Sequence, residues 1–530
     1  MASKSSRGAA TPSLGAAKEL YNTHFKNGHN TLPICLSLPA PDTLTPVIAY
    51  LRLTEGASSS KSSFLLESVL PGSTQGRYSF VGCDPKEVIR ADAGSGDPLV
   101  SLEAALSAYS LIPLPPSASH LSPPFKGGAV GYVGYDCIYS FERVLKTFRP
   151  KQDDLHIPDA YFIISDAIVV FDHLFGSVSI WSHLRVDELS QLESEYEATV
   201  ARMKDVAKRL ARPEVPLPKQ APIKPTEERE AALSNVGRAG YTEFVRKLRD
   251  EHIVAGDIIQ AVPSQRLSRK TDLHPFNAYR YLRQVNPSPY MFYIDCVVPS
   301  TSSSSSSSLQ LVGASPECLL SINPDRYVTN HAIAGTIKRG VTPAEDEQNA
   351  EILLSSIKDR AEHVMLVDLA RNDINRVCKP ETVHVKELMA VQRFSHVMHL
   401  TSTVEGQLRD NQTRYDAFRS IFPAGTVSGA PKIKAMELIA SLEPSTRGVY
   451  AGAVGRWNFG TNKDTQECDT CIAIRTMLFK NGTVYLQAGG GIVWDSEEEA
   501  EYQETVDKLS ANVRTLQQAE DFYAEQDIDV

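Results

Sequence analysis

Short apolar runs broken by turn-forming residues dominate the first part of the chain, up to residue 211. Three of these runs, residues 64–70, 161–164 and 168–173, each predict a β-strand. Residues 186–211 carry acidic and basic side chains at helical spacing and predict a helix. The proline-rich residues 212–240 that follow have no periodicity, so we expect a connector there.

A second part begins at Tyr241, where apolar residues recur at helical spacing as far as Ile253. Helical and strand-like segments then alternate to residue 516, which predicts an α+β protein. Strand-like runs also flank the serine tract 302–308, so we expect a hairpin with an elongated loop. The two ends of the chain, residues 1–40 and 517–530, are predicted to be flexible.

Composition and charge narrow the class of protein. The apolar fraction is 42% and the charged fraction 22%, as in ordinary globular proteins. A net charge of −10 argues against a general nucleic-acid binder, and no apolar stretch is long enough to cross a bilayer. The eight cysteines lie in apolar or strand-like context, so we expect buried, reduced thiols and a cytoplasmic location. Cys468 and Cys471 form a C-x-x-C, but a second pair for a zinc site is missing.

Two acidic signatures carry the first chemical prediction. Asp359 and Glu362 lie three residues apart, as do Glu501 and Glu504, and each pair therefore shares one helix face. Carboxylates with few histidines or cysteines nearby suit Mg²⁺ better than zinc. The pattern predicts a magnesium-dependent enzyme acting on a carboxylated metabolite. Two solvated helices with acidic faces are the plain alternative.

Ten motifs follow one another in the second part. Two of them are the acidic helices that carry Glu362 and Glu504. The others are residues 256–266, 313–317, 333–336, 395–400, 422–432, 447–452, 474–476 and 487–493. In this order they closely resemble component I of anthranilate synthase, a family of chorismate-utilising enzymes, in its eukaryotic or fungal form. The resemblance runs from about residue 40 and is densest between 240 and 510. It implies a fold of twisted, mainly antiparallel sheets packed with helices, with both parts merged into one unit.

The resemblance assigns residues to the binding of chorismate, which carries two carboxylates. Glu362 and Glu504 are implied as Mg²⁺ ligands, supported by Asp359 and Glu501. Mg²⁺ would bridge them to the ring carboxylate, since buried anions need a cation between them. The enolpyruvyl carboxylate would be bound by a set of donors that includes the fork of an arginine in a short strand. These donors are Arg475, Tyr450, Lys508 and the backbone amides of Gly489, Gly490 and Gly491. A glycine-rich hairpin turn, and an ion pair between Lys508 and Glu504, are the plain alternatives.

Catalytic roles are implied in the same way. Glu317 corresponds to the general acid that protonates the departing ring hydroxyl, and it would need a raised pKa. His399 corresponds to the histidine beside the ring, although His396 lies on the same side if this segment is helical. Thr336 and Thr426 are expected to offer hydroxyls to substrate oxygens.

Two positions distinguish anthranilate synthase from its relatives. Aminodeoxychorismate synthases carry a nucleophilic lysine where this chain has Ala334, which excludes covalent attack at this position. Isochorismate and salicylate synthases use a lysine to activate water where this chain has Gln260. Ammonia needs no such base. Gln260 and Ala334 therefore favour the anthranilate reaction.

A tryptophan feedback site is implied by two segments. Glu67 would contact the amino group of tryptophan and Ser68 a polar atom, while Pro289, Tyr290 and Met291 would contact the indole. A strand and a turn packed in the core are the plain alternative.

Some positions depart from common family members. His331 and Ala332 replace Arg-Pro, and Arg456 stands near the expected inhibitor pocket where an aromatic residue is usual. Asn375 and Gln392 replace a glycine and a glutamate. None of these substitutions affects the implied metal ligands or general acid.

The sequence therefore predicts Mg²⁺-dependent conversion of chorismate and ammonia to anthranilate and pyruvate, inhibited by tryptophan. No cysteine lies in a Gly-x-Cys-x-Gly nucleophile turn, so glutamine-derived ammonia would come from a separate amidotransferase subunit, component II. Aminodeoxychorismate synthase component I and a non-catalytic, tryptophan-sensing paralogue are the alternatives.

Overall fold

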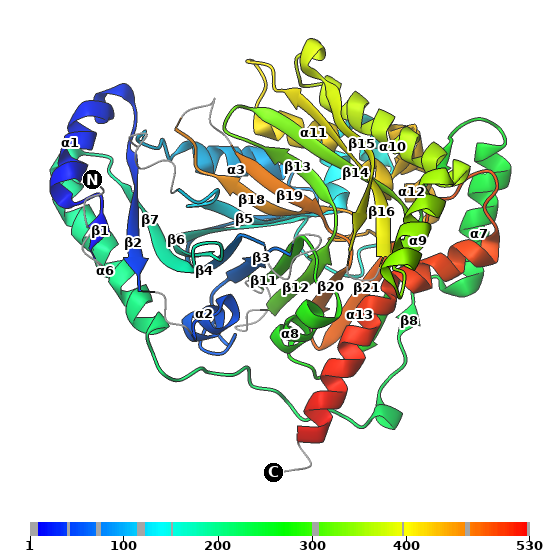
Figure 1. Cartoon of the computed structure of the whole chain (residues 1–530), viewed down its shortest axis with the longest axis horizontal. Helices are drawn as coiled ribbons and strands as arrows, with labels where there is room; N and C mark the ends of the chain where they lie inside the picture. Colours follow the sequence, from blue (N-terminus) through cyan, green and yellow to red (C-terminus); the bar gives the residue numbers. More distant parts are fainter. Residues whose placement is uncertain are drawn as a thin grey trace.

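The structure, a computed structural model, describes residues 9–39, 43–69, 76–113, 122–149, 152–298, 307–394, 397–461 and 467–526. Strands predominate, and the longer helices pack on their faces (Figure 1). The strands are β1 (Ala10–Thr11), β2 (Thr31–Leu38), β3 (Ser63–Glu67), β4 (Tyr78–Ala91), β5 (Gly128–Val133), β6 (Ala160–Asp172), β7 (Ser177–Arg185), β8 (Leu233–Ser234), β9 (Gln260–Ala261), β10 (Ser264–Lys270), β11 (Tyr290–Val298), β12 (Ser307–Ser315), β13 (Cys318–Ile322), β14 (Tyr327–Lys338), β15 (His384–Arg393), β16 (Val397–Gln407), β17 (Gly429–Ala430), β18 (Ala453–Asn458), β19 (Cys468–Ile472), β20 (Thr476–Lys480) and β21 (Thr483–Gly489).

The helices complete the α+β composition. The α-helices are α1 (Leu14–His24), α2 (Pro46–Leu53), α3 (Pro98–Ser107), α5 (Ile138–Phe141), α6 (Leu192–Leu210), α7 (Gly237–Lys247), α8 (Pro275–Val285), α9 (Pro343–Ser355), α10 (Ile357–Asn375), α11 (Arg414–Ile421), α12 (Lys432–Leu442) and α13 (Glu498–Gln526). Short 3₁₀ or π turns are η1 (Phe25–Asn27), η2 (Tyr135–Cys137), η3 (Arg143–Thr147), η4 (Leu189–Gln191), η5 (Thr226–Glu228), η6 (Leu248–Ile253), η7 (Pro380–Thr382) and η8 (Gly425–Val427).

One large sheet branches at the long strand β6. Its first half pairs with β4 and β5, and its second half with β4 and β7. One arm runs β4–β3–β11–β12–β20–β21–β10–β8, and the other runs β5–β18–β19–β13–β14–β16–β15. Every pairing in both arms is antiparallel. The predicted twisted, antiparallel α+β fold is confirmed, and the two parts of the chain share one sheet because β3 pairs with β11 and β5 with β18.

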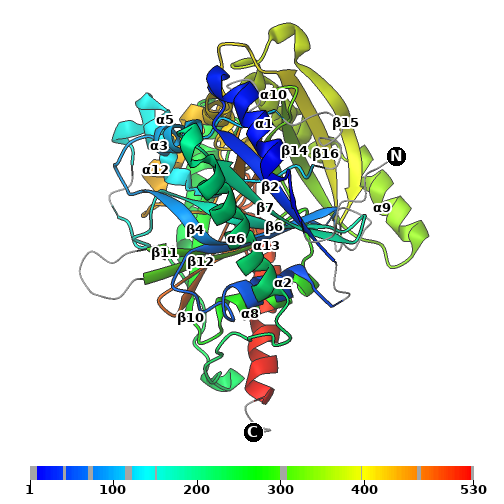
Figure 2. The same ribbon diagram turned by 90° about the vertical axis from the view of Figure 1, so that its left-hand side faces the viewer.

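Helices pack on the apolar faces of the sheet. Helix α10 packs on β14 and β16, while α13 packs on α7, α8 and β21 (Figure 1). On the other side of the molecule, α6 covers β7, and α1 lies against α6 (Figure 2). Helix α9 begins with a capping box, in which Thr342 and Glu345 each satisfy the other's backbone amide.

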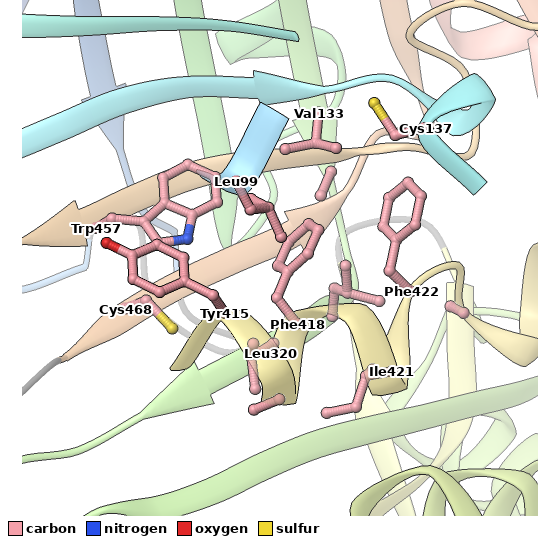
Figure 3. Packing of buried hydrophobic residues seen from close by; sticks show 14 of the residues in the cluster. Leu99, Val133, Cys137, Leu320, Tyr415, Phe418, Ile421, Phe422, Trp457 and Cys468 are labelled. Atoms are coloured by element: carbon pink, nitrogen blue, oxygen red, sulfur yellow. The ribbon is translucent and has the colours of Figure 1, made fainter. Parts of the chain in front are cut away.

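The core joins residues from both parts of the chain. In Figure 3, Leu99 and Val133 from the first part face Phe418 and Trp457 from the second. The indole of Trp457 meets the Phe162 ring edge-on, with centroids 5.2 Å apart. Such shared packing means that neither part would retain its core alone.

Both ends of the chain are more ordered than predicted. Residues 9–39 form β1, α1 and β2, and Tyr21 is fully buried with its hydroxyl donating to the carbonyl of Leu184. Helix α13 continues to Gln526, with Ala519 and Glu520 buried. The prediction of flexible ends is therefore wrong for residues 9–39 and 517–526. Composition alone missed these contacts because they are made with distant segments.

Several elements predicted from the sequence are present in the structure. The expected strands at 161–164 and 168–173 are one continuous strand, β6, and the expected helices begin at Leu192 and Gly237. Strands β11 and β12 pair up to Val298 and Ser307, so the expected paired strands are present and Ser307 and Ser308 belong to β12. Residues 302–306 are outside the described part, as is His396. All eight cysteines are free thiols, seven of them buried. Among the described residues, no helix has the length and apolar character to span a bilayer.

Candidate active site

Glu317 lies in the short link between β12 and β13. Its side chain is buried, and burial raises the pKa of its carboxyl to about 8. The Thr426 hydroxyl donates to Glu317 Oε1 at 3.1 Å, and this bond, the Ile333 amide and the Lys508 charge all limit the rise. Glu317 is therefore protonated near neutral pH and can act as an acid.

His399 lies on β16, directly opposite Thr336 on β14. The segment is a strand and not a helix. The register shifts at Gly335, a glycine with a positive φ of 68°, and His399 Nδ1 lies 2.9 Å from the Gly335 carbonyl and 3.1 Å from Thr336 Oγ1. A carbonyl only accepts, so Nδ1 carries the proton and Nε2 is left as an acceptor. Burial lowers the pKa of His399 to about 4, with help from the charges of Arg475 and Lys508, so the ring is neutral.

Arg475 lies between β19 and β20, not within a strand as predicted. Its φ of 52° is left-handed, and its Nη1 donates to the backbone carbonyl of Lys508 at 2.6 Å. Burial lowers the pKa of the guanidinium, whereas Tyr450 and Glu504 favour its charged form. Such a partly buried cation suits a carboxylate ligand. Burial also raises the pKa of Tyr450 to about 12, so its hydroxyl stays a neutral donor.

The glycine turn after β21 packs tightly against its surroundings. A Cβ on Gly489 would come within 2.4 Å of the Pro263 carbonyl oxygen, and one on Gly491 within 2.5 Å of Gln260 Nε2. The Gly490 amide donates to the Tyr241 hydroxyl at 3.0 Å. This amide is thus engaged inside the protein, and the expectation that it faces a substrate is not met. Tyr241 lies on α7, as the sequence predicted a helix there, and its hydroxyl also orients this turn.

Gln260 contacts this turn from β9. Its side chain is buried, and its Oε1 has no hydrogen-bond partner among the residues that the structure describes. A buried, unpaired carbonyl oxygen is costly, so it offers an acceptor to an N–H group entering the site. Ala334 is buried on β14, in the same strand as Thr336.

The acidic helices are α10 and α13, as predicted. Burial raises the pKa of Glu362, and so do the nearby carboxylates of Glu504 and Asp359. Glu501 is buried, with Oε1 accepting from Ser496 at 2.6 Å and Oε2 lacking a partner in the described chain. Asp359 accepts from the Ser356 hydroxyl at the start of α10.

The negative charge of these carboxylates and the unpaired Oε2 of Glu501 suit a hard divalent cation. Within the described ranges, no three acidic, histidine or cysteine side chains converge at ligand distance, so substrate or water oxygens would have to complete the coordination. Lys508 links this group to the glycine turn: its Nζ lies 2.6 Å from Glu504 Oε1 and donates to the Gly489 carbonyl at 2.9 Å. The ion pair anticipated as the plain alternative for Lys508 is therefore present.

The two predicted inhibitor segments lie side by side. Glu67 on β3 is directly opposite Met291 on β11, and the Val69 amide donates to the Ser288 carbonyl at 3.0 Å. The Glu67 carboxylate accepts from Tyr279 at 2.7 Å and pairs with Arg283 at 2.8 Å.

The neighbours of Glu67 define one end of this site. Ser68 is half-buried beside Gly76, and Pro289 precedes β11. At the other end, the Tyr290 hydroxyl donates to Asp469 Oδ1 at 3.0 Å. Asp469, which lies between Cys468 and Cys471, was not predicted from the sequence to belong to this site. A charged residue at an inward-facing position of an apolar strand was the available signal.

A buried ion pair contacts Tyr450, one of the predicted substrate-binding residues. Arg447 and Glu443 are paired at 2.7 Å, and the guanidinium lies over the rings of Tyr135 and Tyr450 at 4.4 and 5.6 Å. Their i,i+4 spacing was visible in the sequence, but their burial was not.

Comparison with known proteins agrees with this geometry. The family model described as chorismate binding enzyme matches residues 63–514. A Schizosaccharomyces pombe relative is 50% identical over 516 residues, covering 97% of this chain and 98% of its own. Anthranilate synthase component 1 from Saccharomyces cerevisiae is 48% identical over 520 residues, covering 97% of both chains. The crystal structure of anthranilate synthase component I from Streptococcus pneumoniae superposes with a TM-score of 0.68 at 36% identity, covering 89% of this chain and 98% of that one. The chain therefore belongs to the chorismate-binding enzyme family, within its anthranilate synthase component I branch.

Proposed function

We propose that this protein converts chorismate and ammonia to anthranilate and pyruvate, the first step of tryptophan biosynthesis. The observation that carries the proposal is Glu317, a buried carboxylic acid held protonated near neutral pH on a chorismate-binding scaffold. The Saccharomyces cerevisiae relative, anthranilate synthase component 1, is named for the same reaction.

Each step is assigned to a group of this chain. Arg475 and Lys508 bind the enolpyruvyl carboxylate of chorismate, with Tyr450 as a neutral donor. Glu317 protonates the departing C4 hydroxyl, which leaves as water while ammonia forms a bond to C2. The ammonium formed at C2 returns its surplus proton to Glu317. The neutral Nε2 of His399 then accepts the C2 proton as the ring aromatises, and this proton passes to the departing enolpyruvate, which becomes pyruvate. Over the whole reaction, chorismate and ammonia give anthranilate, pyruvate and water.

We propose Mg²⁺ as the cofactor, held by Glu362 and Glu504 with Asp359 and Glu501 in support. The ion would neutralise the ring carboxylate beside these acidic side chains. The raised pKa of Glu362 and the orphaned Glu501 Oε2 support this assignment, because both indicate uncompensated negative charge.

Two side chains distinguish this reaction from its nearest alternative. Ala334 has no nucleophile with which to form a covalent intermediate of the aminodeoxychorismate type. The unpaired Gln260 Oε1 is suited to accept a hydrogen bond from ammonia, whereas it cannot deprotonate water. Free ammonia would be replaced in the cell by ammonia from a glutamine amidotransferase subunit, component II. The eight free thiols support a cytoplasmic location.

The direct test is incubation of the purified chain with chorismate, Mg²⁺ and ammonium at mildly alkaline pH. We expect anthranilate, identified by fluorescence and mass, together with pyruvate, and loss of both when EDTA is added. Aminodeoxychorismate as the product would contradict the argument from Ala334. Tryptophan binding without any turnover would support the non-catalytic alternative.

We propose that tryptophan inhibits the enzyme at the site formed by Glu67, Ser68, Pro289, Tyr290 and Met291. Ser68→Leu should raise the tryptophan concentration for half-inhibition roughly tenfold, since overpacking of this kind costs ~1.4 kcal/mol. Activity without tryptophan should persist. Ser190→Leu, at an exposed position, is the control. Equal inhibition of the Ser68 variant and the parent would remove this site from consideration.

A further inference from the structure

Ser496 lies in the tight turn that leads into α13. It is buried, its hydroxyl donates to Glu501 Oε1 at 2.6 Å, and the same oxygen accepts from the Val493 amide at 3.0 Å. The Ser496 amide donates in turn to the Val493 carbonyl at 3.1 Å. An amide can only donate and a serine hydroxyl has one proton, so that proton is directed at Glu501.

The bonds of this serine differ from those of an ordinary helix cap. A serine at the start of a helix commonly accepts from an amide of the helix itself. Ser496 accepts instead from Val493, which lies outside α13, and it donates to a side chain. Its two bonds therefore fix the direction of the Glu501 carboxylate.

Glu501 is left with one oxygen at a defined position. Its Oε1 is held by Ser496, and its Oε2 is buried and has no partner in the described chain. A Cβ added to Gly490 would come within 3.1 Å of Oε2, so this oxygen lies against the glycine turn. The charges of Glu504 and Lys508 both act on the Glu501 carboxyl, which places it beside the acidic group. Such an oxygen suits Mg²⁺ or one of its water ligands.

Arg249 holds the Ser496 turn from the side of α7. It lies in η6, the π turn that follows α7, and its guanidinium is only partly exposed. Its Nη1 donates to the Ser496 carbonyl and its Nη2 to Glu498 Oε1, both at 2.8 Å. Single π turns are uncommon and often lie at functional sites. Here the guanidinium connects the Ser496 turn to the first residue of α13.

We propose that Ser496 is a positioning residue for Mg²⁺, that it holds Glu501 with Oε2 free for the ion or its bound water, and that Arg249 fixes Ser496. Removal of a group that orients metal ligands typically weakens metal binding by about 10–100-fold. The inference rests on the proposed Mg²⁺ site and deepens it, because it names the residues that orient one of the acidic side chains.

The test measures Mg²⁺ affinity by calorimetric titration of the full chain with saturating chorismate and no nitrogen donor. Ser496→Ala should weaken this affinity about tenfold or more, the lower end of the range for such a group. Ser496→Thr, which keeps the hydroxyl, should bind Mg²⁺ nearly as tightly as the parent. Ser182→Ala is the matched control and should leave the affinity unchanged, since Ser182 is also buried and its hydroxyl donates to the Asp166 carbonyl at 2.7 Å.

A second variant tests the outer contact. Arg249→Met should also weaken Mg²⁺ binding, but by less than Ser496→Ala, because Arg249 acts through the serine. In the double variant it should add little to the effect of Ser496→Ala, since residues that act through one contact are not additive. Arg246→Met, which removes an exposed ion pair with Glu243 on α7, is its control.

Melting temperatures measured without Mg²⁺ separate positioning from stability. A lower melting temperature for Ser496→Ala with unchanged Mg²⁺ affinity would indicate a purely structural role and would overturn the proposal. Equal weakening by Ser496→Ala and Ser496→Thr would also overturn it, because the hydroxyl would not be the cause. A parent that binds no Mg²⁺ would overturn the metal site and the positioning role together. A parent that shows the expected Mg²⁺ binding, with the expected loss in Ser496→Ala, but forms no anthranilate would overturn the proposed reaction alone.

Discussion

Glu317→Gln is expected to lower kcat by about 10²–10⁴-fold, the range for loss of a general acid. Glutamine keeps the size of the side chain and a hydrogen-bonding group toward Thr426, but its amide N–H is not acidic enough to protonate the departing hydroxyl. Because the C4–O bond cannot break readily without that proton, KM for chorismate should change much less than kcat. Steady-state assays of anthranilate formation provide both numbers.

The pH profile gives an independent check on this assignment. Burial raises the pKa of Glu317 to about 8, so its acid form is present below that pH and is lost as the pH rises through it. In the parent, kcat/KM should therefore fall above about pH 8. The residual activity of Glu317→Gln should lack this alkaline limb. Glu520→Gln, which replaces a buried glutamate paired with Arg269, should keep the limb even if it lowers stability. An unchanged alkaline limb in the Glu317 variant would assign the ionisation to another group.

Removing a proposed metal ligand is the second change with a large expected effect. Glu362→Gln should lower activity by about 10²-fold or more, because a buried charge left without its partner costs several kcal/mol. The same substitution should abolish the dependence of chorismate affinity on Mg²⁺. Calorimetric titration of chorismate with and without Mg²⁺ measures this linkage without any turnover.

The expected direction follows from the electrostatics of the two acidic helices. In the protein alone, burial and the Glu504 carboxylate both raise the pKa of Glu362, so negative charge there is disfavoured. A divalent cation reverses this, and chorismate with Mg²⁺ should raise the melting temperature of the parent more than either does alone. Glu499→Gln, at an exposed position of α13 paired with Arg238, is the control. Chorismate binding that is equally tight in EDTA would argue against a metal bridge at this site.

The sequence predicted local features well because they depend on near neighbours in the chain. The i,i+3 spacing of Asp359 and Glu362 required only a helix, and α10 provides it. The strand pattern on either side of the serine tract required only period-two alternation, and β11 and β12 pair as expected. The order of the motifs was enough to identify the family, since it reflects many positions at once.

Predictions failed where distant segments decide the outcome. Residues 9–39 look flexible by composition, yet Tyr21 is buried by the strand that ends at Arg185. The Gly490 amide looked free for a substrate, yet the Tyr241 hydroxyl accepts from it across 249 residues of sequence. Burial and partner choice are properties of the packed chain, so no local pattern could show them.

By itself the sequence determined the chemistry available to this protein: which acids, cations and glycines it has, and that Ala334 and Gln260 offer neither a nucleophile nor a base. Only the tertiary structure decided the state of those groups. Packing between distant segments buries Glu317 enough to keep it protonated, and it shields His399 enough to keep it neutral. It also brings Tyr290, Asp469 and Arg456 together from three strands. The physical reason is that a pKa and an ion pair depend on which surfaces lose contact with water, and long-range strand pairing determines that loss.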